Sequence, residues 1–411
     1  MIDITKLFTG IDTTGDPLRY GHKTGSQHGR PHETETQDHQ VPRSAAQRRP
    51  VVVWNITRTC NLHCIHCYTD SHDEIYPGEL TLEEAKAMID NLADFGIPAL
   101  LLSGGEPLTR PDFFSIAEYA RSKGLRLTLS TNGTLITPET AQRIKETGFS
   151  YVGISFDGLG DINDRFRGKA GAFEEALAGL RNCQAVNQKV GLRFTLTRRN
   201  YEALHDIFDF IEKEDIPRAC FYHLVYSGRG SHLSKDDLSH EETRDALDII
   251  LERTLDYAKR DLHKDILTVD NHVDGAYLYL KLKEIDPINA EKALSYLKWN
   301  GGGANSSGVG IGQIDMFGNV HPDQFWQDLE LGNVRERNFS EIWQDTSHPI
   351  FAGLKNRLPL LKGKCAGCHW KDICGGSFRA RAWKVYQDPW APDPACYLTE
   401  EEINYPREDL S

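Results

Sequence analysis

The chain has 411 residues, 39% of them hydrophobic, and is therefore long enough to bury a large core in about two or three domains. A formal net charge of -13 at pH 7 argues against a nucleic-acid-binding surface, which requires clustered Lys and Arg. The sequence contains no long apolar run and does not open with a charged segment followed by an apolar stretch, so we expect a cytoplasmic protein with neither membrane span nor signal peptide.

Residues 1–49 are expected to form a mobile polar arm. From about Thr13 to Arg49 the chain is poor in aliphatic residues and rich in His, Gln, Thr, Gly and Arg, a composition that buries too little surface to fold alone. Four histidines in this stretch suggest metal binding, but their irregular spacing favours a solvated tail. They are His22, His28, His32 and His39.

From residue 50 onward, short apolar runs alternate with amphipathic helical segments. The predicted strands are Val51–Ile56, Ala99–Leu102, Leu125–Ser130, Tyr151–Phe156, Leu192–Leu196 and Cys220–Val225. Helix starts are indicated by a capping box at Thr81, by Pro111, and by Thr137 followed by Pro138. This alternation predicts an α/β fold with a curved parallel sheet or partial barrel, whose functional site lies at the carboxyl ends of the strands.

The segment after the first strand carries Cys60, Cys64 and Cys67 in a Cys-x3-Cys-x2-Cys spacing. Three thiolates hold three irons of a [4Fe–4S] cube and leave the fourth iron open to a small molecule. The alternative is a structural zinc site completed by His63 or His66, although zinc sites usually pair two Cys-x-x-Cys units.

Three further motifs stand at later strand ends. Gly104 and Gly105, which permit close backbone approach, are followed by Glu106, whose carboxylate can accept hydrogen bonds from an ammonium group. Asn132 and Ser155 end the next two strands. In isolation, all of these are ordinary turn chemistry.

A second group of cysteines lies near the carboxyl terminus. Cys365, Cys368, Cys374 and Cys396 could close a tetrahedral zinc site or fully ligate a second [4Fe–4S] cluster, and spacing alone does not choose. Cys183 and Cys220 stand alone and are expected to be buried small hydrophobes.

The cysteine triad followed by Gly-Gly-Glu-Pro resembles the signature of the radical S-adenosylmethionine (radical SAM) enzymes. The resemblance implies a partial (β/α)6 TIM-like barrel over residues 50–260. It also implies that SAM binds the open iron and is cleaved reductively to a 5'-deoxyadenosyl radical. The residues implied to contact SAM are His66 against the adenine, Gly104, Gly105, Glu106, Asn132, Ser155, Arg167 and Val225, with Arg165 as a competitor of Arg167 for the SAM carboxylate.

The second cysteine group resembles one ligand set of the SPASM/twitch-type branch. Asp323 and Phe378 stand where that branch has further cysteines, so the resemblance implies one auxiliary cluster and two [4Fe–4S] clusters in total. The implied organisation is a helical linker with a Gly-rich loop at 261–310 and an auxiliary-cluster domain at 311–411. A low-potential donor of the flavodoxin or ferredoxin type is the implied partner.

Around the second cluster, Trp299 to Gly308 and Gly318 to Trp326 resemble the NirJ-type proteins of heme d1 biosynthesis. This implies a tetrapyrrole substrate, 12,18-didecarboxysiroheme, that loses two propionate side chains. The alternatives are acetate removal in the siroheme-dependent heme pathway, a SPASM peptide-modifying enzyme, and a noncatalytic iron–sulfur carrier. His321 and His272 are candidate axial ligands to the tetrapyrrole iron, although a structural role is the commoner one for such residues.

Overall fold

A computed structural model describes residues 1–13 and 49–405. Within them, 11 strands form one sheet in the order β1-β8-β7-β6-β5-β4-β3-β2-β9-β10-β11. Its central strands are all parallel: β2 (Val51–Asn55), β3 (Leu100–Ser103), β4 (Leu127–Thr131), β5 (Tyr151–Ser155), β6 (Val190–Leu196), β7 (Arg218–His223) and β8 (Asp265–Val269).

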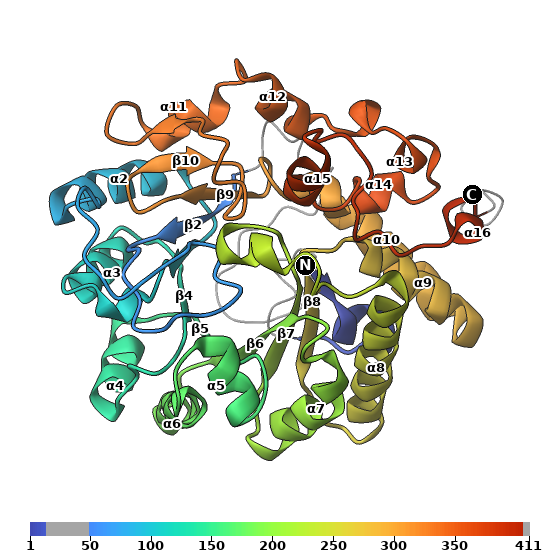
Figure 1. Ribbon diagram of the computed structural model, residues 1–411, viewed down its shortest axis with the longest axis horizontal. Helices are drawn as coiled ribbons and strands as arrows, with labels where there is room; N and C mark the ends of the chain where they lie inside the picture. Colours follow the sequence, from blue (N-terminus) through green and yellow to red (C-terminus); the bar gives the residue numbers. More distant parts are fainter. Residues whose placement is uncertain (14–48, 406–411) are drawn as a thin grey trace, which may run out of the picture.

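The parallel strands curve into an arc whose outer side is covered by helices (Figure 1). These helices are α2 (Leu82–Phe95), α3 (Phe113–Ser122), α4 (Pro138–Thr147), α5 (Asp161–Arg167), α6 (Ala172–Ala185), α7 (Leu204–Lys213) and α8 (His240–Lys259). The predicted helix starts are confirmed at two places, because Thr81 forms a capping box with Glu84 and the Thr137 side chain accepts from the Thr140 amide. The expected partial α/β barrel is therefore present.

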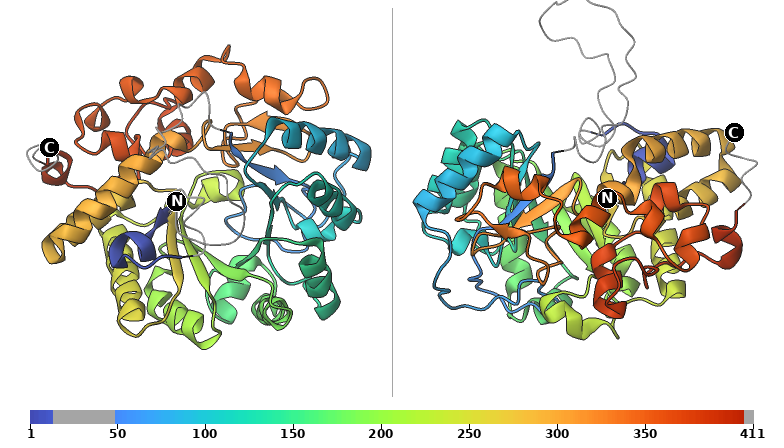
Figure 2. Two further views of the ribbon diagram at one scale, coloured as in Figure 1. Left: turned by 180° about the vertical axis from the view of Figure 1, so that it is seen from behind. Right: turned by 90° about the horizontal axis from the view of Figure 1, so that it is seen from above.

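The carboxyl-terminal part of the chain spans the open side of the arc, between β2 and β8 (Figures 1 and 2). Its helices are α9 (Val273–Ile285), α10 (Pro287–Asn300), α11 (Phe339–Gln344), α12 (Pro349–Lys355), α13 (Lys364–Gly367), α14 (Lys371–Cys374), α15 (Arg379–Tyr386) and α16 (Glu400–Ile403). Its strands are β9 (Ile311–Ile314), β10 (Asn319–His321) and β11 (Gly332–Asn333). Short helical turns are η1 (Thr5–Thr9), η2 (Pro107–Thr109), η3 (Tyr201–Ala203), η4 (Gly228–Leu233), η5 (Gly302–Asn305) and η6 (Leu358–Leu360).

The predicted domain boundaries at 260 and 310 differ from the observed arrangement. β8 falls inside the predicted linker, yet it pairs in parallel with β7 and is a barrel strand. β9 pairs in parallel with β2, so the carboxyl-terminal part continues the barrel sheet. A strand of four or five residues between two helices carries too weak a periodic signal to be distinguished from a linker.

The expectation of a mobile arm over residues 1–49 is wrong for its first residues, which form β1 and the helical turn η1. β1 (Ile2–Asp3) pairs antiparallel with β8, and Ile4, Leu7 and Phe8 are buried in the core. This segment of a few apolar residues is too short to show a period in the sequence, and its pairing with β8 became visible only in the tertiary structure. Residues 14–48, including the four histidines, lie outside the described residues. Across residues 1–13 and 49–405, no helix combines the length and apolarity that a membrane crossing requires.

Candidate active site

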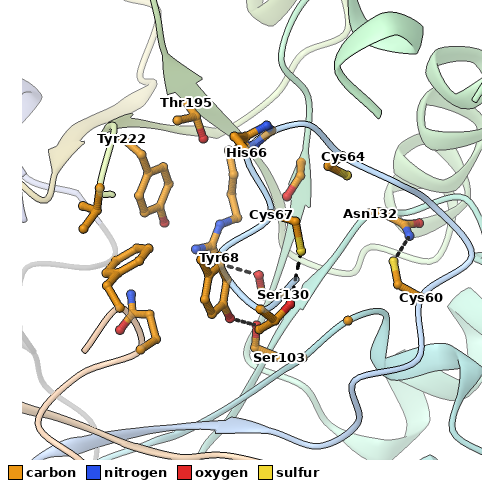
Figure 3. Close-up of a pocket in the computed structure, with 18 of the residues that line it drawn as sticks. Cys60, Cys64, His66, Cys67, Tyr68, Ser103, Ser130, Asn132, Thr195 and Tyr222 are labelled. Carbon is orange, nitrogen blue, oxygen red and sulfur yellow. Dashed lines mark hydrogen bonds between the residues drawn. The ribbon is translucent and has the colours of Figure 1, made fainter. Parts of the chain in front are cut away.

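The main pocket opens at the carboxyl ends of the barrel strands, as the fold predicts. It contains about 1120 Å³ of empty space, including the part open to solvent, and Cys60, Cys64 and Cys67 all line it (Figure 3). The structure therefore brings the three cysteines of the triad to one cavity, together with residues from β2 through β7.

The cysteine loop is held in place by backbone hydrogen bonds to distant segments. The His63 amide donates to the Arg167 carbonyl at 3.1 Å, and the Ile65 amide donates to the Phe166 carbonyl at 3.0 Å. Burial raises the pKa of the Cys60 and Cys64 thiols above the usual range, so burial alone keeps them neutral. Thiolate ligation at such a site requires a compensating cation, which iron would supply. The donor set fits a cluster with one open iron.

The two glycines after β3 allow the chain to pass directly beside the cysteine loop. A Cβ on Gly104 would lie 2.4 Å from the Thr57 carbonyl oxygen, and a Cβ on Gly105 would lie 2.3 Å from that of Thr59. Neither approach is possible for a residue with a side chain. Both glycines line the pocket, so their backbone groups are available to a ligand there.

Glu106, a predicted SAM contact, is fully buried, and its carboxylate is hydrogen-bonded to groups of the chain itself. The carboxylate accepts hydrogen bonds from the Thr131 hydroxyl at 2.7 Å, the Asn132 amide at 2.7 Å and the Leu108 amide at 3.1 Å. Burial raises its pKa to about 7. In the structure, Glu106 ties the β3 loop to the end of β4 and does not belong to the pocket lining.

A buried ion pair stands behind the cysteine loop. Asp157 Oδ2 lies 2.5 Å from an Arg167 nitrogen and 3.2 Å from His66 Nε2. Arg167 also lies 3.6 Å from Cys64 Sγ, and it lines the pocket with His66, whereas Arg165 is exposed. The structure thus places Arg167, and not its competitor, at the cavity. Sequence reasoning did not single out Asp157, and its position just after the end of β5 was the available signal.

The remaining predicted SAM contacts also line the cavity. Asn132 donates to Asn61 Oδ1 at 2.8 Å and lies 4.0 Å from Cys60 Sγ, while Ser155 and Val225 lie at the ends of the strands beyond. Sequence reasoning missed two other lining residues, Arg193 and Tyr222, because they lie within strands and belong to no motif.

A second, smaller cavity of about 390 Å³ is lined by the carboxyl-terminal cysteines Cys365, Cys368, Cys374 and Cys396. Burial raises the pKa of Cys368 to about 11, and the neighbouring thiols add to the effect. No three His, Cys, Asp or Glu side chains of residues 1–13 and 49–405 are grouped so that they could hold a single metal ion. Four thiols around one cavity are a donor set that fits a fully ligated [4Fe–4S] cluster.

Asp323 and Phe378, which stand where the SPASM/twitch-type branch has further cysteines, are both buried. Asp323 accepts hydrogen bonds from the Phe325 and Trp326 amides and therefore shapes the turn after β10.

The two candidate axial histidines lie away from the main pocket. His321 is buried on β10, with Nδ1 3.0 Å from the Leu329 carbonyl oxygen, and His272 is buried at the start of α9. Neither is part of the pocket lining.

Comparison with known proteins gives a consistent picture. The profile of the Radical SAM superfamily matches residues 54–211. The chain is 51% identical over 408 residues to the Fe-coproporphyrin III synthase of Methanosarcina barkeri, covering 98% of this chain and 99% of that protein. It is 44% identical over 355 residues to the pre-heme d1 synthase of Dinoroseobacter shibae, covering 86% and 87%. The fold matches that of Streptococcus suis SuiB bound to the precursor peptide SuiA, with a TM-score of 0.65 and 18% identity over 85% of this chain and 76% of that one.

Proposed function

The chain belongs to the radical SAM superfamily, and from that premise we propose that it acts on a tetrapyrrole, removing acetate side chains from 12,18-didecarboxysiroheme to form Fe-coproporphyrin III. The observation that carries this proposal is the 51% identity to the Methanosarcina synthase, which extends over 98% of the chain and includes its amino-terminal part. The likeness to SuiB, at 18% identity, concerns the fold alone.

The proposed ligands of the SAM-binding [4Fe–4S] cluster are Cys60, Cys64 and Cys67. When bound, this cluster and SAM would supply the 5'-deoxyadenosyl radical needed for a C–H bond that is too weakly acidic for a positioned base. The chain's own residues would hold SAM beside the open iron. Gly104 and Gly105 would do so through backbone groups, Ser155 at the ribose or the carboxylate, Arg167 at the carboxylate, and His66 at the adenine. Each of these lines the main pocket, which supports the assignment.

The proposed auxiliary cluster is held by Cys365, Cys368, Cys374 and Cys396. Four thiolates saturate its irons, so it would exchange electrons with a low-potential donor and bind no substrate. Residues 378 and 323 offer no thiol for a third cluster.

A second candidate is propionate removal in heme d1 biosynthesis, favoured by the 44% identity to the Dinoroseobacter synthase. One experiment separates the two. The anaerobically reconstituted protein is incubated with SAM, a strong reductant and 12,18-didecarboxysiroheme, and the mass of the tetrapyrrole is followed with the 5'-deoxyadenosine released. Loss of acetates supports the proposal, loss of propionates replaces it with the heme d1 reaction, and an unchanged tetrapyrrole contradicts both.

A further inference from the structure

Arg193 occupies an unusual place for a charged side chain, inside the barrel. β6 alternates strictly, with Leu192, Phe194 and Leu196 buried in the hydrophobic core. Arg193 and Thr195 therefore point to the opposite face, and both line the main pocket. The alternation of side chains along β6 therefore places the Arg193 guanidinium in the cavity that the cysteine triad also lines.

The neighbouring strand makes room for this side chain. A Cβ on Gly153, in the middle of β5, would lie 2.8 Å from Arg193 Cδ and 3.3 Å from Cγ. The missing side chain lets the Arg193 stem lie across β5, and Nη1 reaches the Ser130 hydroxyl on β4 at 2.8 Å. The guanidinium carbon lies 4.7 Å from the centre of the Tyr222 ring. Three strands thus hold the guanidinium in one orientation.

Arg193 differs from the other arginines of the cavity in its charge balance. Arg167 pairs with Asp157 at 2.5 Å, and Arg229 pairs with Asp70 at 2.9 Å. Among the residues that the structure describes, no carboxylate forms an ion pair with Arg193, and the guanidinium donates a hydrogen bond to the neutral Ser130 hydroxyl. A guanidinium has five N–H donors, so most of them remain for a ligand.

We propose that Arg193 is the anchor for a carboxylate of the substrate, held in a bidentate fork over the Tyr222 ring. This inference rests on the proposed function, because the proposed tetrapyrrole carries the carboxylates that the anchor would bind. An arginine suits the task, since its planar fork matches a carboxylate and its face stacks on an aromatic ring. By fixing one side chain of the macrocycle, Arg193 would act as a positioning residue for the reaction.

The test compares binding of 12,18-didecarboxysiroheme and of its methyl ester to the reconstituted protein, followed anaerobically by the tetrapyrrole absorbance. For Arg193→Gln we expect the Kd of the acid to rise about ten- to a hundredfold, as for the loss of a hydrogen-bonded charge. The wild type should prefer the acid to the ester, and the variant should lose most of that preference. Arg193→Lys, which keeps the charge but not the fork, should fall between them.

Two controls separate this effect from damage to the protein. Arg143→Gln removes an exposed arginine paired with Glu118 outside the pocket and should change no Kd. Iron content and the Kd of SAM should stay at wild-type values in Arg193→Gln. Should Arg193→Gln lose iron, the comparison is made with Arg193→Lys, which retains a cation in the barrel.

The outcomes are distinguishable. If the wild type binds no tetrapyrrole, the proposed function fails, and the anchor fails with it. If the wild type binds but Arg193→Gln binds equally well and still prefers the acid, only the anchor is refuted. If the variant loses affinity for SAM and not for the tetrapyrrole, Arg193 belongs to the SAM site and the inference is overturned.

Discussion

Arg381 connects the carboxyl-terminal part of the chain to the barrel, and its replacement tests how much this connection stabilises the fold. It lies on α15, is fully buried, and forms a two-pronged contact with Asp393, with nitrogen–oxygen distances of 2.8 and 3.1 Å. Its remaining N–H groups donate to the carbonyls of Leu224 and Asp270 at 2.7 and 2.9 Å. Leu224 and Asp270 line the main pocket, whereas Asp393 lines the cysteine cavity, so one side chain connects both sites.

Replacing Arg381 by Met leaves Asp393 as a buried charge without its partner. Burial raises the pKa of the Asp393 carboxyl, but the Arg381 guanidinium outweighs this and holds the pKa below its usual range. Removing one member of a buried pair costs about 3–5 kcal/mol of unfolding free energy. The matched control is Arg337→Met, whose pair with Asp345 is 45% and 32% exposed and is worth about 1 kcal/mol or less.

The assay is anaerobic urea unfolding followed by Trp fluorescence, with iron content measured on the same samples. A lowered pKa contributes stability that is fully present above the unfolded value of about 4 and is lost as the pH falls from there through the folded pKa. The difference between wild type and Arg381→Met should therefore shrink as the pH falls below about 4. A loss no larger than that of Arg337→Met would refute the view that this buried pair joins the two parts of the chain.

Three further predictions follow from the site. Glu106→Gln removes the carboxyl whose pKa is about 7. A carboxyl with a raised pKa makes the free energy of unfolding fall as the pH rises through that pKa. The wild type should therefore lose about 1 kcal/mol of unfolding free energy relative to the variant between about pH 6 and pH 8. Urea unfolding of both proteins at both pH values measures this difference. An equal change in unfolding free energy in wild type and variant would contradict the prediction. Cys365→Ala should lower the iron content from about eight to about four atoms per chain, whereas an unchanged content would exclude an auxiliary cluster there. Asp157→Asn removes the partner of Arg167 and should raise the Kd of SAM about tenfold in equilibrium dialysis; an unchanged Kd would mean that other contacts orient Arg167.

The chemistry of the site could be predicted from local sequence. Cys60, Cys64 and Cys67 lie within eight residues of one another along the chain, so a compact loop brings their thiols together whatever the rest of the fold. The same holds for the capping box at Thr81, where the residues that interact are three apart. The alternation of short apolar runs with amphipathic helical segments also predicted the partial barrel, because each run and each helix is a local feature of the chain.

Other features depend on contacts between residues far apart in the chain. The pairing of β1 with β8 joins residues 2 and 268, and nothing near residue 2 indicates its partner. Glu106 stands beside two pocket-lining glycines, yet it turns toward Thr131 because donors from β4 reach it there.

The sequence by itself determined which chemical groups are present and which neighbours along the chain they meet, because backbone geometry sets those distances. Only the tertiary structure decided that Arg193 crosses Gly153 to reach Ser130 and Tyr222. The order of strands in the sheet, and not their order in the chain, sets which side chains share the barrel interior. The register of the packed sheet therefore decides which cation in the cavity has no carboxylate partner within residues 1–13 and 49–405.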